Sequence, residues 1–271
     1  MKKIDLEELK KVELNILKDI DELCVREGIR YSLCGGTLLG AIRHGGFIPW
    51  DDDIDIFMPR PDYNRFVRYC KEHQTPFRLE AHEINPKYGY LFAKAMDVNT
   101  VIFEENTNNS HQDWGVCVDI FPIDGLSNTY DGAIKEMKKT RFKRELLVAY
   151  NWSHFFRSKS RSIVYEPIRL VFYLLSRHSK ADKLIPKIQA KYPEDGFGTY
   201  AYGGAVCGSY REKEILPMEV YSEFGTISFE GYEFMAIKNK EAYLESIYGD
   251  YMKLPPEEKR VSHHTFEAYY R

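Results

Sequence analysis

The sequence lacks the long hydrophobic runs that mark membrane-spanning and exported proteins. Nowhere in its 271 residues do apolar side chains continue for the roughly 18 positions that a spanning helix needs. The first 24 residues carry charges throughout and contain no apolar core of a secretory signal. We therefore expect a protein of the cytoplasm.

Cysteines with metal-binding or disulfide-type spacing are also missing. The five cysteines, which contain no CxxC pair, are Cys24, Cys34, Cys70, Cys117 and Cys207. An odd set with such irregular spacing predicts reduced thiols that pack as small hydrophobic residues. Neither a zinc site nor a disulfide framework is expected.

There is no excess of positive charge. The chain has 38 Lys and Arg against 41 Asp and Glu, a formal net charge of -3. Proteins that hold nucleic acid through bulk charge are basic, so we expect no nucleic-acid partner. A hydrophobic content of 44% is enough for a substantial folded core.

The hydrophobic periodicity predicts an α+β fold. We expect residues 90–98 and 100–105 to form a hairpin around Asn99, Pro122 to end the next strand, and residues after Pro256 to form a polar tail. Residues 131–191 are expected to be helical. The other expected elements are helices at 5–27, 37–43, 62–73 and 241–249, strands at 29–34, 53–58 and 116–121, and a hairpin at 226–237.

An unusual concentration of acid occurs at residues 51–55, Asp-Asp-Asp-Ile-Asp, which lie between apolar residues. Residues two apart on a strand point to the same face, so Asp53 and Asp55 are expected to project together. A divalent cation would remove their mutual repulsion. The alternative is a solvated acidic turn before an edge strand. Asp51 and Asp52 are either outer ligands or simple turn residues.

A third carboxylate is expected from a neighbouring strand. Asp119 is an acid within the otherwise apolar stretch 116–121, where an unpaired charge would be costly. Asp124, just past that strand, is the weaker candidate. The predicted metal ligands are thus Asp53, Asp55 and Asp119, and oxygen ligands favour Mg²⁺ or Mn²⁺.

A possible phosphate site precedes the acids. Gly35, Gly36 and Thr37 join an expected strand to a helix, and amides at a helix start can bind phosphate. Arg43 and His44 either bind phosphate or pair with the first acids of the cluster. Together with a metal, this pattern indicates a bound polyphosphate, such as a nucleotide.

Two further features leave alternatives open. Lys94 is either a phosphate ligand or an ordinary exposed strand lysine. Residues 258–264, with Lys259, Arg260, His263 and His264, form a solvated tail or fold back to contact a phosphate.

The apolar run 170–175 is flanked by basic residues. It either lies on a membrane surface or forms a buried helix with basic ends. The flanking basic residues are Arg157, Lys159, Arg161, Arg177 and Lys180.

The stretch from Cys34 to Asp55, CGGTLLGAIRHGGFIPWDDDID, closely resembles the signature of the LicD family. These proteins are phosphocholine transferases of bacterial surface polysaccharides, related to the fukutin-type ribitol-phosphate transferases of eukaryotes. Asp119 followed by Phe121-Pro122, and the later stretch YGDYM with Leu254-Pro255-Pro256, also resemble the family.

The resemblance implies a nucleotidyltransferase-like mixed β-sheet with flanking helices. We expect the chain to divide into three parts. These parts are a catalytic core at 1–128, a helical segment at 129–191 that faces the acceptor or a membrane, and a C-terminal part at 192–271 that packs on the core. The family's Gly-Gly loop then falls on Gly35 and Gly36, and its acids fall on Asp53, Asp55 and Asp119.

The activity implied by the resemblance is transfer of phosphocholine from CDP-choline to a sugar hydroxyl, with release of CMP. The acceptor would be a lipid-linked precursor of teichoic acid or lipopolysaccharide, met at the inner face of the membrane. One or two Mg²⁺ ions would bind the acids and the diphosphate, Asp119 would bridge them or act as base, and Arg43 would balance developing charge.

Other activities remain open from the sequence alone. CDP-ribitol, CDP-glycerol or an ethanolamine donor would require the same acids as CDP-choline. A nucleotidyltransferase that moves NMP from an NTP to a small molecule would also share them, but would release pyrophosphate. A non-catalytic nucleotide- or glycan-binding protein is the third alternative, against which the intact acid set argues.

Overall fold

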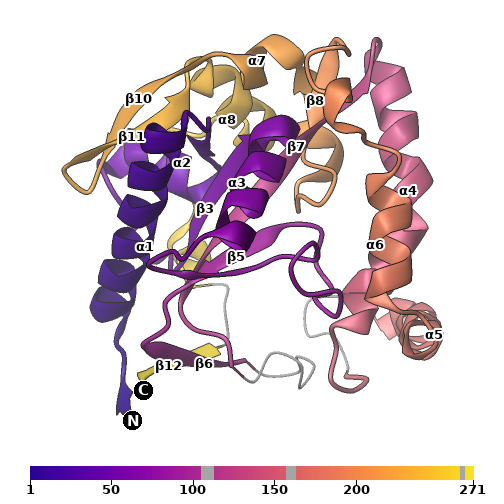
Figure 1. The fold of residues 1–271 in the computed structure, drawn as a ribbon, viewed down its shortest axis with the longest axis horizontal. Helices are drawn as coiled ribbons and strands as arrows, with labels where there is room; N and C mark the ends of the chain where they lie inside the picture. Colours follow the sequence, from indigo (N-terminus) through magenta and orange to yellow (C-terminus); the bar gives the residue numbers. More distant parts are fainter. Residues whose placement is uncertain (105–112, 157–162, 263–265) are drawn as a thin grey trace.

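The computed structural model describes residues 1–104, 113–156, 163–262 and 266–271, and it has the expected mixed α+β fold (Figure 1). The predictions made for Arg157, Lys159, Arg161, His263 and His264 lie outside these residues. The helices are α1 (Leu6–Glu27), α2 (Gly35–His44), α3 (Arg60–Glu72), α4 (Tyr130–Tyr150), α5 (Glu166–Arg177), α6 (Ala181–Gln189), α7 (Met218–Ser222) and α8 (Lys240–Tyr248).

Strands of the described chain form three sheets. Their bounds are β1 (Lys2–Lys3), β2 (Ser32–Leu33), β3 (Ile54–Pro59), β4 (Arg78–Glu80), β5 (Ala93–Met96), β6 (Thr100–Glu104), β7 (Cys117–Ser127), β8 (Tyr202–Gly204), β9 (Leu216–Pro217), β10 (Phe224–Phe229), β11 (Tyr232–Ile237) and β12 (Phe266–Tyr270).

The main sheet has the strand order β2-β3-β7-β5-β4, and β8 and β9 extend it beyond the far end of β7. β3 and β7 run parallel, whereas the other pairs are antiparallel. α1 and α3 both pack against β3 and β7. β7 lies between β3 and β5, so side chains from these three strands can lie next to one another at the centre of the sheet.

Helix α1 shows how local signals set the fold. Asp5 caps its first turn by accepting from the amide of Glu8, whose carboxylate in turn accepts from the amide of Asp5. Gly28 ends the helix at a φ of +62°, a conformation that suits glycine. The apolar face of Ile16 and Ile20 is buried in the main core. The predicted helix is therefore confirmed.

The predicted hairpin around Asn99 is wrong. β5 pairs with β4 and β7, whereas β6 pairs with β12 in the smaller sheet β1-β12-β6. The two stretches are adjacent in sequence, but each finds a more distant partner. The residues after Pro256 are likewise not only a polar tail, because they include β12, whose Ala268 is buried beside Ile4.

Pro122 does not end its strand, since β7 continues to Ser127. The pairing with β5 stops at Ile120, and the pairing with β8 begins at Asp124. Pro122 therefore lies where that edge of β7 has no partner, which is where a strand tolerates a missing N–H.

Residues 131–191 are largely helical, as predicted. α4 packs against α5, α6 and β7, and Figure 1 shows these three helices on the opposite side of the molecule from α1. Met137 on α4 and Ile185 on α6 belong to a separate apolar cluster that also contains Leu126 of β7.

Asp124 has a structural partner. Its two carboxylate oxygens accept from Nε and Nη2 of Arg60, at 2.7 and 3.0 Å, and both side chains are buried. Burial raises the pKa of Asp124, and Arg60 opposes that shift. This bidentate ion pair joins the start of α3 to β7, so Asp124 does not contribute to the acid cluster.

We expect Asp124→Asn to lower the free energy of unfolding by about 3–5 kcal/mol, because it leaves the Arg60 guanidinium buried without its counter-charge. Urea unfolding measures this. The control is Asp113→Asn, whose exposed carboxylate pairs with Arg78 and Arg271 and should matter by less than about 1 kcal/mol. Equal losses in the two variants would contradict the assignment.

Candidate active site

Three charged side chains form a row across the centre of the main sheet. Asp55 on β3 is the register partner of Asp119 on β7, which is in turn opposite Lys94 on β5. Nζ of Lys94 lies 2.5 Å from Oδ1 of Asp119. The side chain of Lys94 is only 14% exposed, so the alternative of an ordinary surface lysine is wrong.

The charges in this row depend on one another. Burial disfavours the ammonium form of Lys94, but Asp119 more than offsets this and raises the pKa of Lys94 above its ordinary value. Burial, followed by the nearby Asp53 and Asp119, raises the pKa of Asp55 well above its ordinary range. Lys94 therefore stays cationic, and Asp55 lies in an environment that disfavours a further negative charge.

The predicted glycine loop is fastened to the strand that carries Asp55. The amide of Cys34 donates to the carbonyl of Asp55 at 3.0 Å, and the amide of Asp55 donates to Oγ1 of Thr37 at 2.8 Å. Helix α2 begins at Gly35, two residues earlier than predicted, and Gly35 has a φ of +52°. Thr37 thus fixes the strand and the helix start relative to each other.

The positive φ of Gly35 favours glycine, and a carboxylate approaches each of the two glycines. A Cβ atom on Gly36 would lie 2.5 Å from Oδ2 of Asp51, and one on Gly35 would lie 3.4 Å from Oδ2 of Asp55. A helix N-terminus favours such negative groups. A phosphate at the same helix end would meet these carboxylates, so its binding requires a cation between them.

The acids before β3 lie close enough together to hold a metal ion. Single ligand oxygens of Asp51, Asp52 and Asp53 all lie within 4.8 Å of one another, which no other set of three potential ligands does in the described part of the chain. Oδ2 of Asp52 also accepts from Oγ of Ser262 at 2.5 Å. The predicted set of Asp53, Asp55 and Asp119 is spread more widely, and Asp119 faces Lys94.

Glu13 on α1 is a member of the site that sequence reasoning missed. Its side chain is buried, and Oε2 has no hydrogen-bond partner among the residues described. Burial, followed by Asp53 and Asp52, raises its pKa well above the ordinary range. The available signal was an acid within the apolar stripe of the helix, between Leu9 and Ile16.

Cationic and aromatic residues lie on another side of the acids. Nη1 of Arg43 donates to the carbonyl of Tyr251, while its buried Nε lacks a partner in the described chain. The guanidinium of Arg260 lies 5.7 Å from the ring centre of Trp50, which His44 also contacts edge-on. The C-terminal segment therefore folds back onto the acidic loop, so it is not simply a solvated tail, and its contact with a phosphate stays a prediction.

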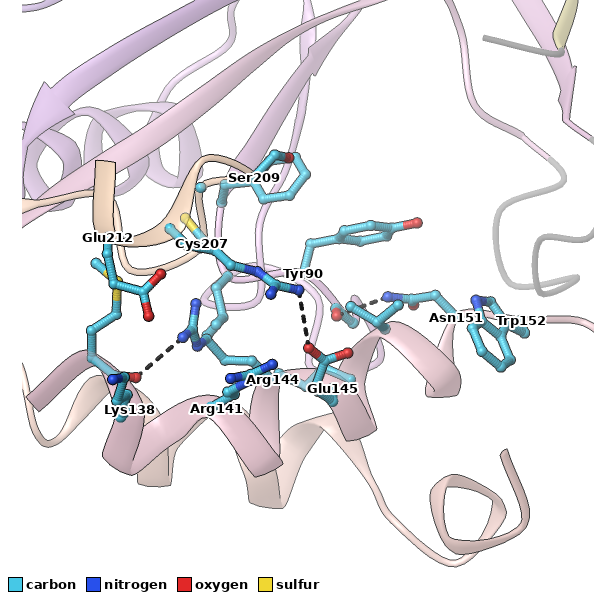
Figure 2. A pocket seen from close by; sticks show the side chains of 18 of the residues that line it. Tyr90, Lys138, Arg141, Arg144, Glu145, Asn151, Trp152, Cys207, Ser209 and Glu212 are labelled. Atoms are coloured by element: carbon cyan, nitrogen blue, oxygen red, sulfur yellow. Dashed lines mark hydrogen bonds and ion pairs between the residues drawn. The ribbon is translucent and has the colours of Figure 1, made fainter. Parts of the chain in front are cut away.

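A large cavity of about 650 Å³ opens beside the site, between α4 and the loops that precede β5 and follow β8. Figure 2 shows Lys138, Arg141 and Arg144 reaching from α4 toward Tyr90 and the loop that contains Ser209. The buried Nε of Arg144 has no hydrogen-bond partner in the parts of the chain described. The size of the cavity and its mixture of aromatic and charged groups suit a polar organic ligand.

The large cavity shares lining residues with a small cavity next to Asp55. Gly208 and Ser209 line both, and the small cavity also contains Gly35, Asp55 and Glu214. Burial raises the pKa of Glu214 to about 8. A ligand that extends from the large cavity into the small one would therefore lie next to Asp55 on β3.

We expect Gly36→Ala to weaken Mn²⁺ binding by about tenfold or more, since the new methyl group displaces the Asp51 carboxylate. Stability should change little, because Asp51 can rotate away. Titration followed by electron paramagnetic resonance measures free Mn²⁺. The control is Gly225→Ala, whose Cβ would make only an ordinary 3.6 Å contact with Lys238. Unchanged Mn²⁺ affinity in Gly36→Ala would contradict this geometry.

Comparison with known proteins identifies the family of the chain. Residues 28–159 match the family described as LicD/FKTN/FKRP, nucleotidyltransferase domain. The chain is 37% identical to the lipopolysaccharide cholinephosphotransferase LicD of Haemophilus influenzae, over 99% of both chains. It is also 39% identical to the ribitol 5-phosphate transferase FKRP of Mus musculus, over 32% of this chain and 16% of that one. The chain therefore belongs to the LicD family.

Proposed function

We propose that the protein transfers phosphocholine from CDP-choline to a sugar hydroxyl of a cell-surface polysaccharide precursor, of the lipopolysaccharide or teichoic acid type, and releases CMP. It is an enzyme of the phosphotransferase class. The observation that carries the proposal is the row of Asp55, Asp119 and Lys94 beneath the first turn of α2, in a chain that matches a cholinephosphotransferase over its whole length.

The acids fit a divalent metal ion, Mg²⁺ or Mn²⁺. Asp53 and Asp55 stay the predicted ligands, and the approach of Asp51 to Gly36 supports adding it to the set. When bound, the ion would neutralise the acids and the donor diphosphate and polarise the phosphorus centre. Asp119 is a predicted ligand or base, and its contact with Lys94 supports a role beside the transferred group.

The chain's own residues would position both substrates. The amides of Gly36 and Thr37 lie in the first turn of α2, where a helix offers them no acceptor, and so suit a metal-bound phosphate. The amide of Gly35 already donates to the hydroxyl of Tyr243. Arg43, whose Nε has no hydrogen-bond partner among the described residues, suits the leaving phosphate of CMP. His44 lies beside Trp50 at the edge of this region.

In the reaction, the acceptor oxygen forms a bond to the phosphorus that carries choline, and the bond from that phosphorus to the CMP oxygen breaks. The hydroxyl proton passes to a carboxylate of the row, with Asp119 as the predicted recipient. Lys94, held cationic by Asp119, would stabilise charge on the transferred phosphoryl oxygens.

We assign the acceptor to the large cavity. The shared lining of Gly208 and Ser209 would bring one end of a bound glycan to Asp55. Tyr90 offers an aromatic surface for a sugar ring, and Arg141 offers charge for acidic substituents.

The partial matches to FKRP proteins favour one alternative, a CDP-ribitol or related donor, with the same chemistry and a different head group. A location at the inner face of the membrane remains a prediction. No helix in the described part of the chain is both long and apolar enough to cross a bilayer.

We expect CMP release from CDP-choline to depend on Mg²⁺ and on a glycan acceptor, and Asp55→Asn to reduce it about a thousandfold, the equivalent of several kcal/mol of transition-state stabilisation. Asp131→Asn, an exposed acid on α4, is the matched control. The assay measures CMP across a panel of CDP-alcohols, with pyrophosphate from NTPs scored in parallel.

CMP from CDP-ribitol alone would keep the reaction and change the donor. Pyrophosphate from an NTP, with no CMP from any CDP-alcohol, would identify a nucleotidyltransferase instead. Near-normal turnover by Asp55→Asn would contradict the role of the acids.

We expect Arg141→Ala to raise the KM for the acceptor about tenfold while leaving the KM for CDP-choline unchanged, since it removes one charged contact in the cavity. Steady-state kinetics with each substrate varied in turn measure both constants. Lys135→Ala, an exposed cation on α4 outside the cavity, is the control. A raised KM for CDP-choline instead would assign the cavity to the donor.

A further inference from the structure

Helix α5 has the reverse of the usual distribution of polar and apolar residues. Its two buried residues are Arg169 and Ser176. Five of its aliphatic side chains are 40–54% exposed: Ile168, Leu170, Val171, Leu174 and Leu175. Ile163, Val164 and Tyr165, just before the helix, are more than half exposed as well. We call these eight residues the α5 apolar face.

Specific contacts hold the polar side of α5 inward. The guanidinium of Arg169 lies 4.7 Å from the ring centre of Trp152 and pairs with Glu166. Arg177 donates to the carbonyls of Ala149 and Tyr150 at the end of α4, at 2.9 and 3.0 Å. Rotating the helix to bury its aliphatic side chains would break these contacts, so they stabilise the orientation in which the aliphatic side chains face outward.

An apolar patch of this kind on a water-soluble surface marks a binding surface. Figure 1 shows α5 at an outer corner of the molecule, beside the ends of α4 and α6. Phe142 of α4 packs against Phe172 and is itself 57% exposed, so the patch continues onto the neighbouring helix.

The surrounding charge identifies the partner. Residues 130–191 contain 15 of the chain's 38 Lys and Arg but only five of its 41 Asp and Glu. Lys180, Lys183 and Lys187, on and just before α6, are exposed, and so are Lys135 and Lys139 of α4; the ends of these two helices adjoin α5. A second copy of this basic surface would be repelled, whereas an anionic surface would be attracted.

The length of α5 also suits one kind of surface. Its residues span about 18 Å, roughly half of what a bilayer-crossing helix requires. A short helix with one apolar face and basic surroundings lies in the plane of the membrane interface, with its apolar side chains among the acyl chains.

We propose that the α5 apolar face docks the protein on an anionic lipid bilayer. Ile168, Val171, Leu174 and Leu175 enter the interface, and Lys180 and the exposed lysines of α6 contact lipid phosphates. The same α4 that carries α5 also lines the large cavity, so docking holds the cavity close to the headgroups. The membrane contact itself does not depend on which substrate the cavity takes.

The test is flotation of the full-length protein with vesicles of phosphatidylcholine, alone or mixed equally with phosphatidylglycerol. We expect binding to the mixed vesicles that weakens as salt is raised. The double variant Val171→Glu/Leu174→Glu should bind at least about tenfold more weakly. Val25→Glu, at an aliphatic residue of α1 that is 65% exposed, should bind like the unmodified protein. Circular dichroism checks that the variants are folded.

Three results would overturn the proposal. They are an absence of wild-type binding to the mixed vesicles at low salt, equal weakening by Val25→Glu and by the double variant, and equal binding to vesicles of phosphatidylcholine alone. Sedimentation tests the competing occupant. A wild-type dimer that the double variant converts to a monomer would make the face a contact between copies and would also overturn it.

Discussion

Mutual repulsion among carboxylates is the constraint around which the site is built. Single oxygens of Asp51, Asp52 and Asp53 lie within 4.8 Å of one another, and Asp55 and Asp119 follow on the adjoining strands. Two charges at such a separation repel by roughly 3 kcal/mol at an effective dielectric constant near 20. The positive N-terminal end of α2 and the charge of Lys94 offset part of this repulsion. A cation bound between the acids would relieve it further.

The rigid elements of the main sheet make this crowding possible. Thr37 and Cys34 bond to the backbone of Asp55, so the acid-bearing strand cannot move away from α2 without losing both bonds. The buried pair of Arg60 and Asp124 fixes the other end of the same sheet to α3. The acids therefore occupy set positions before any ligand arrives, which is the preorganisation that electrostatic catalysis needs.

Local signals in the sequence predicted the elements that carry the site. The apolar periodicity of α1, the acid-apolar alternation of β3 and the acid within the apolar stretch 116–121 each act over a short stretch, and each was sufficient. The row of Asp55, Asp119 and Lys94 could be predicted only in part, because the sequence suggested the acids but not the register that brings Lys94 opposite Asp119.

Features that depend on distant pairing could not be predicted. β6 and β12 are joined across more than 160 residues, and nothing in either stretch specifies the other. Glu13 looked like an ordinary helix acid because its neighbours in space come from β3 and β7. The large cavity is likewise formed by segments around Tyr90, Arg144 and Ser209, which are remote in sequence.

The sheet β1-β12-β6 joins the two ends of the chain, since Lys2 is paired with Tyr270. The segment that carries Arg260 and Ser262 is thereby anchored on both sides, by α8 before it and by β12 after it. Its contacts with Trp50 and Asp52 are intramolecular, and they benefit from a high effective concentration. A fusion partner that disturbs the pairing at either terminus would thus weaken the contacts of Arg260 and Ser262 with the acidic loop, although the termini lie in a different sheet.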